Sequence, residues 1–162
     1  MQTNHNWIWF FAVLVVLGVA AVAINWAYNA RQQLTLAQLH AAEDKWEKVG
    51  PVDYDLVVDK TIQSGNSEEP IHDRIEVQVR NKTVVAASLN GAPMKLRFWG
   101  ENDMIAWFGF IEQFLEIDAA PGAPRTFRTA EFDPVTGYIR HFTRSVSTSR
   151  ERQELVLRVT AS

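Results

Sequence analysis

The most continuous hydrophobic segment of the chain lies near its N-terminus. Residues 7–24 read WIWFFAVLVVLGVAAVAI, without a charged or strongly polar side chain. As a helix, this segment would extend about 27 Å, close to the thickness of the hydrocarbon core of a bilayer. Trp7 and Trp9 at one end, and Trp26 and Tyr28 at the other, match the aromatic belts found at membrane interfaces. The pattern therefore predicts a transmembrane helix that anchors the protein through Trp7 to Tyr28.

Two aspects of this segment stay open at the level of sequence. Ala21-Val22-Ala23 has the small residues of a signal-peptide cleavage site, although residues 2–6 lack the usual Lys or Arg. A retained anchor at residues 1–30 is therefore favoured over a cleaved one. Arg31 follows the segment and no basic side chain precedes it, so the positive-inside rule weakly favours a cytoplasmic C-terminal domain.

Residues 31–162 alternate between helical and strand patterns. Leu34 to Val49 has apolar residues three or four positions apart, a Thr35/Gln38 capping box and a stop at Gly50-Pro51. Asn102 to Ile117 carries so wide an apolar face that we expect a buried helix. Alternation of period two predicts strands at 54–63, 74–80 and 83–89, a further short strand at Met94 to Phe98, and strands at 126–132, 138–146 and 153–160.

This order predicts an α+β fold for a single soluble domain, residues 31–162, behind an N-terminal transmembrane helix. We expect an antiparallel sheet of five to six strands packed against two helices, in the order helix, two or three strands, helix, three strands. Asn81-Lys82 and the segment from Asp133 to Gly137 have the composition of tight hairpin turns.

The same features resemble a known family. The segment Trp46…Gly50-Pro51-x-Asp53-Tyr54-Asp55-Leu56, the hairpin around Asn81-Lys82 and the turn Phe132-Asp133-Pro134-x-Thr136-Gly137-Tyr138 are similar to a bacterial family of small exported or membrane-anchored proteins. That family is classed only as a domain of unknown function. The resemblance implies a location outside the cytoplasm, against the charge rule, and it brings no catalytic residues.

Composition and motifs argue against most chemistry. The chain has no cysteine, which excludes disulfides and thiolate ligands, and its net charge of −3 is spread without the basic cluster that nucleic acids require. The histidines have no metal-ligand spacing: His5, His40, His72 and His141. No nucleotide-binding or nucleophile motif occurs. We therefore predict no cofactor, no metal, no nucleic-acid partner and no enzymatic activity.

One surface feature suggests a site. If the last three strands pair in order, strict alternation would gather an exposed face of arginines and aromatics: Arg128, Tyr138, Arg140, Phe142, Arg144, Arg152 and Arg158. Such a face suits an acidic protein partner or anionic headgroups. The alternative, which we favour, is a solvated sheet face whose arginines pair with Glu131, Glu151 and Glu154 across strands.

The preferred functional hypothesis is a single-pass, membrane-anchored, non-enzymatic interaction module of the cell envelope that binds a protein partner or a surface through its sheet. The alternative is a small-ligand-binding or enzymatic domain with a pocket between the aromatic helix and the sheet. A third is a small subunit of a membrane complex, its anchor contacting another span through Gly18, Ala20 and Ala21. A pocket with convergent polar groups would favour the second, and an exposed patch the first.

Overall fold

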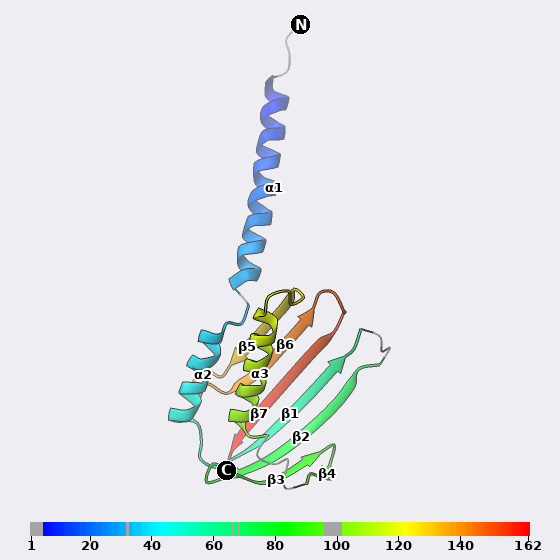
Figure 1. Cartoon of the computed structure of the whole chain (residues 1–162). Coiled ribbons are helices and arrows are strands. Elements are labelled where there is room, and N and C mark those ends of the chain that lie inside the picture. The colour runs from blue at the N-terminus through cyan, green and yellow to red at the C-terminus, as the bar shows by residue number, and fades with distance from the viewer. Residues whose placement is uncertain (1–4, 32, 66, 68, 96–101) are drawn as a thin grey trace. The chain divides into compact units, whose positions relative to one another are not determined.

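The structure is a computed structural model that describes residues 5–31, 33–65, 67, 69–95 and 102–162. It divides into two compact units, Met1–Gln33 and Leu34–Ser162. The first unit contains helix α1 (His5–Arg31). The second contains all the other helices and strands that the structure describes, which Figure 1 shows.

The predicted membrane anchor, Trp7 to Tyr28, is contradicted. No helix in the described part of the chain is long and apolar enough to cross a membrane. The predicted single-pass location, with the domain outside the cytoplasm, is contradicted by the same finding.

The second unit is one seven-stranded antiparallel sheet with the helices α2 (Leu36–Val49) and α3 (Met104–Ala119). The strands, in chain order, are β1 (Tyr54–Gln63), β2 (Ile71–Arg80), β3 (Thr83–Leu89), β4 (Ala92–Pro93), β5 (Thr126–Phe132), β6 (Ile139–Val146) and β7 (Arg152–Ala161). Their order in the sheet is β4-β3-β2-β1-β7-β6-β5. The last strand of the chain therefore lies at the centre of the sheet, next to β1.

The prediction of five to six strands is also wrong, because the sheet has seven. Asn90 and Gly91 both have positive φ, 51° and 81°, and they turn the chain sharply after β3. The short strand β4 forms immediately after this turn and pairs with the end of β3. Met94 and Lys95 lie outside any strand, and the rest of the predicted strand at Met94 to Phe98 lies outside the described residues.

The two helices lie on one face of the sheet, which we call the helix face (Figure 1). Thr35 and Gln38 form the capping box that the sequence predicts at the start of α2, and Asp103 caps α3. Because strand side chains alternate, one set points toward the helices and is buried. The core combines these with the helices' apolar stripes: Leu39, Trp46, Leu56, Val58, Val77, Met104, Phe108, Ile111, Leu115, Phe142, Leu155 and Leu157.

The opposite side, which we call the open face, carries the other set of strand side chains. On β1, the buried residues Leu56 and Val58 alternate with the less buried Asp55, Val57 and Asp59. The same alternation continues on β2 and β7. Neither α2 nor α3 lies on this side of the sheet in Figure 1.

Candidate binding groove on the open face

Oppositely charged side chains pair across the open face. These pairs are Arg80 with Asp55, Arg74 with Glu76 and Asp59, Arg158 with Asp59, and Arg152 and His141 with Glu154. Register explains the cross-strand pairs, because Asp59 stands opposite Arg74 on β2 and near Arg158 on β7. Each pair is partly exposed and so contributes at most about 1 kcal/mol to folding. The face is therefore polar and close to neutral over most of its area.

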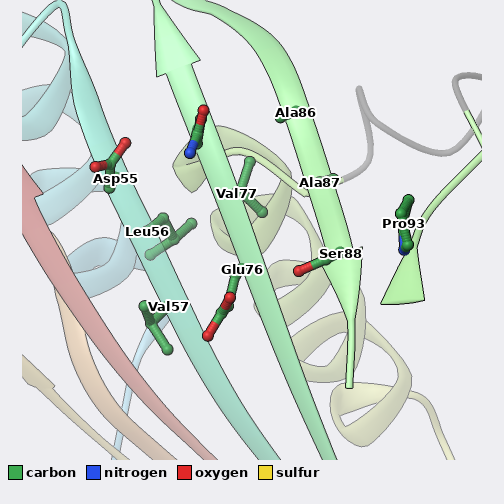
Figure 2. Close-up of a pocket in the computed structure, with 10 residues that line it drawn as sticks. Asp55, Leu56, Val57, Glu76, Val77, Ala86, Ala87, Ser88 and Pro93 are labelled. Atoms are coloured by element: carbon green, nitrogen blue, oxygen red, sulfur yellow. The ribbon is translucent and has the colours of Figure 1, made fainter. Parts of the chain in front are cut away.

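A groove of about 500 Å³ interrupts this surface over β1, β2, β3 and β4. Its lining comes from three consecutive residues on each of the longer strands, together with one from β4: Asp55, Leu56, Val57, Glu76, Val77, Gln78, Ala86, Ala87, Ser88 and Pro93. Figure 2 shows α3 behind the strands, with Asp55, Glu76 and Ser88 on the near side. The groove therefore opens away from the helices.

Small side chains produce the hollow. Ala86 and Ser88 follow each other on the open face of β3, where longer side chains would fill the space above β2. The floor is rigid because Leu56, Val77 and Ala87 point to the other side and are buried in the core. The shape of the groove is therefore set by the sheet itself and does not depend on a loop.

The charges of the lining are all negative. Among the lining residues that the structure describes, only Asp55 and Glu76 are charged, and both carboxylates are roughly half exposed. Arg80, from outside the lining, binds one oxygen of Asp55 at 2.8 Å, and Arg74 binds one oxygen of Glu76 at 2.9 Å. Each carboxylate therefore has a second oxygen that can accept a hydrogen bond from a ligand.

The structure divides the predicted arginine and aromatic face between the two sides of the sheet. Phe132 pairs with Ile139 and Glu131 with His141, so Arg140 is an extra residue, a β-bulge. Phe142 and Arg144, beyond the bulge, point to the helix face and are buried. The seven residues therefore do not form one surface, since the bulge reverses the alternation on which that prediction depended.

The remaining members of the predicted set have local partners. Tyr138 precedes β6 and contacts Trp46, while Arg140 binds Asp133 at 2.6 Å. Arg128 lies on the helix face near Asp118. Only Arg152 and Arg158 stand on the open face, and each forms an ion pair there. The favoured alternative expected pairs with Glu131, Glu151 and Glu154 across strands. Instead, Arg152 pairs with Glu154 within β7, and Arg158 pairs with Asp59 on β1.

The pocket expected between the aromatic helix and the sheet is occupied by core side chains along most of α3. Trp107 contacts Phe110, which contacts Phe114, and Phe108 stacks on Phe132. Lys60 and Arg144 lie over the rings of Phe110 and Phe114. At the start of α3, however, there is a concavity to which Asp103 and Ile105 contribute.

The histidines of the second unit each contact one side chain. His40 pairs with Glu112 between α2 and α3, His72 with Thr61, and His141 with Glu154. The hydrogen bond that His40 donates to the Glu112 carboxylate raises the pKa of His40. Among the residues that the structure describes, no three metal-binding side chains come together.

Sequence analysis assigned Asp55 and Glu76 to polar strand positions but did not identify them as a site. The sequence contains one indication of the groove, the run of small residues Ala86-Ala87-Ser88. This run indicates a groove only if it pairs beside the two acidic residues, and the sequence alone does not fix that pairing register. No family model and no curated protein matches this sequence. The resemblance to a family of exported or anchored proteins therefore stays a prediction.

Proposed function

We propose that the protein is a non-enzymatic interaction module that binds a short, extended, basic segment of a partner protein in the groove on the open face. The observation that carries this proposal is the described lining of the groove, which has two carboxylates and no cation and lies on a rigid sheet.

The dimensions of the groove fit a segment of this kind. Three residues along a strand extend about 10 Å, and four adjacent strands extend about 14 Å across the sheet. About four residues of extended chain would cover that width. Because the floor is already ordered, binding would not require the sheet to reorganise, which reduces its entropic cost.

Charge selects the partner. A lysine or arginine side chain entering the groove would meet the free oxygens of Asp55 and Glu76, whereas an acidic side chain would be repelled. Arg74 and Arg80 hold the carboxylates in place, so the site is positioned before the ligand arrives. We expect weak binding, because the area is far smaller than that of a stable protein complex.

The test uses three labelled pentapeptides, AKAKA, AQAQA and AEAEA, titrated into the full chain and followed by fluorescence anisotropy and by amide chemical shifts. We expect AKAKA to bind most tightly and to shift the amides of Val57, Gln78 and Ser88. The double variant Asp55→Asn/Glu76→Gln should weaken AKAKA binding about tenfold, or ~1.4 kcal/mol.

A second double variant, Glu69→Gln/Glu131→Gln, is the matched control, because it removes the same charge from exposed positions outside the groove. It should leave the affinity unchanged. Equal binding of AKAKA and AEAEA, or equal losses in the two double variants, would show that the groove does not select a basic segment.

A further inference from the structure

A second cavity, which we call the cleft, lies where α2 ends and α3 begins. Its volume is about 390 Å³, and it shares no lining residue with the groove. The lining comes from the end of α2, the loop into β1, the β2–β3 turn and the start of α3: Trp46, Glu47, Gly50, Pro51, Tyr54, Lys82, Asp103 and Ile105. Four separate parts of the chain therefore converge on one small space.

One side of the cleft is aromatic and fixed in position. Trp46 and Tyr54 meet edge to face, with ring centroids 5.2 Å apart, and both are almost fully buried. The hydroxyl oxygen of Tyr54 accepts a hydrogen bond from the backbone N–H of Met104, at 3.3 Å. Gly50 packs directly on the indole, because a Cβ there would lie 2.8 Å from the ring of Trp46. These contacts hold the wall in one arrangement.

Charged side chains of both signs complete the lining. Lys82 belongs to a turn in which Asn81 and Lys82 have positive φ, 51° and 58°, and the turn is tied down by a hydrogen bond from the Lys82 N–H to the Val52 carbonyl. Glu47 extends from the last turn of α2. Within the described residues, neither the Lys82 ammonium nor the Glu47 carboxylate forms a hydrogen bond or an ion pair.

These two side chains differ from the arginines of the open face. Arg74, Arg80 and Arg158 on the open face are all paired with acidic residues. The third charged group of the cleft, Asp103, is held in place as the cap of α3, since one oxygen of its carboxylate accepts the Ala106 N–H at 2.8 Å. The cleft therefore presents one unpaired cation and one unpaired anion beside an apolar wall.

We propose that the cleft binds a small zwitterionic molecule of the amino-acid class. The carboxylate of the ligand pairs with Lys82, its ammonium group pairs with Glu47, and its apolar side chain lies against Trp46 and Ile105. A purely anionic ligand would meet the charges of Glu47 and Asp103, and a purely cationic ligand would meet Lys82. The volume of the cleft suits a ligand of this small size.

The test compares molecules that share one apolar group and differ in charge. L-Leucine carries both charged groups, isopentylamine carries only the ammonium, and 4-methylpentanoate carries only the carboxylate. Each is titrated into the full chain, together with L-phenylalanine, and followed by the indole resonance of Trp46 and the amide of Ile105. We expect L-leucine to bind about fivefold more tightly than either single-charge analogue.

Two substitutions separate the two charges. Lys82→Gln should reduce the affinity for L-leucine to that for isopentylamine, and Glu47→Gln should reduce it to that for 4-methylpentanoate. Lys48→Gln and Asp44→Asn are the charge-matched controls. Both residues lie on α2 and outside the lining, and both variants should preserve the order of affinities.

Two results would overturn the proposal. One is the absence of shifts at Trp46 and Ile105 with both L-leucine and L-phenylalanine. The other is an order of affinities that neither Lys82→Gln nor Glu47→Gln changes. All the substituted side chains are exposed, so the variants should fold, and the rest of the amide spectrum shows whether they do. Neither result bears on the proposed function, because the peptide titration tests the groove, which shares no lining residue with the cleft.

Discussion

At the scale of single residues, the turn between β5 and β6 shows how few side chains determine a local structure. Asp133 accepts hydrogen bonds from the backbone N–H of Thr136, at 2.8 Å, and of Val135, at 3.0 Å. The bond from Thr136 is the largest influence holding the pKa of Asp133 low, at about 2. Gly137 follows with φ of 84°, in the left-handed region that favours glycine.

Gly137 also touches another element. A Cβ at this position would lie 2.4 Å from the carbonyl oxygen of Ala42 and 3.0 Å from Cβ of Lys45, both on α2. Lys45 reaches back and donates a hydrogen bond to the carbonyl of Pro134. The turn and the helix therefore approach more closely than any side chain at residue 137 would allow.

We expect Gly137→Ala to destabilise the domain by about 2 kcal/mol, from backbone strain and from displacement of α2. Gly122→Ala is the matched control, because Gly122 has a similar φ of 82° with nothing within 4 Å of its Cβ position. It should cost about 1 kcal/mol. Urea denaturation of both variants measures the difference, and equal losses would show that the contact with α2 contributes nothing.

The two ends of this hairpin turn also show which local structures the sequence could predict. Asp133, Pro134 and Gly137 identify a turn from their residue types alone. The bulge at Arg140 has no such signature, because it exists only in the pairing of β6 with β5. One extra residue was therefore enough to place Phe142 and Arg144 on the buried helix face, where the sequence had predicted exposed side chains.

At the scale of elements, a buried ion pair attaches the end of α3 to the sheet. Arg144 on β6 donates to both oxygens of Asp118, at 2.6 and 3.0 Å, and both side chains are nearly inaccessible to solvent. Arg128 on β5 lies 3.5 Å from the same carboxylate. Burial raises the pKa of Asp118, but the hydrogen bond and charge of Arg144 lower it more, so the net shift is downward.

Removing one partner of this ion pair should be costly, because the other charge stays buried. We expect Asp118→Asn to lower the free energy of unfolding by about 3 kcal/mol. Glu116→Gln, an exposed position in the same turn of α3, removes the same charge and should change it by less than ~0.5 kcal/mol. Similar unfolding midpoints for the two variants would mean that α3 does not need this attachment.

The sequence predicted individual helices and turns better than it predicted the number of strands. The capping box at Thr35, the stop at Gly50-Pro51 and the hairpin turn at Asn81-Lys82 are local signals, and the structure contains all three features. The strand β4 has only two residues, too few to show alternation, and it forms because of the turn at Asn90-Gly91. Local patterns therefore predict long elements and miss short ones.

At the scale of the whole molecule, strand order was the part that sequence could not supply. The pairing of β1 with β7 joins residues about one hundred positions apart, from Tyr54 with Ala161 to Gln63 with Arg152. Nothing within either strand specifies this partner, since alternation indicates which side of a strand is buried but not what lies beside it. The groove, which crosses four strands, depends on that order as well.

The division into two units gives a prediction at this scale. Every residue of the described hydrophobic core lies within Leu34–Ser162. We therefore expect a chain that begins at Leu34 to unfold at the same denaturant midpoint as the full chain. A chain that ends at Glu151 should fail to unfold cooperatively, because it lacks β7. Circular dichroism with urea measures both, and a large loss of stability in the first chain would show that the domain needs residues 1–33.

The central position of β7 has a consequence for synthesis on the ribosome. Before residues 152–161 leave the exit tunnel, β1 to β4 and β5 to β6 are two separate ribbons, each with an edge that has no partner. Such edges readily pair with other chains. The nascent polypeptide therefore depends on β7 to close the sheet, and until β7 pairs, these edges are open to aggregation and to binding by chaperones.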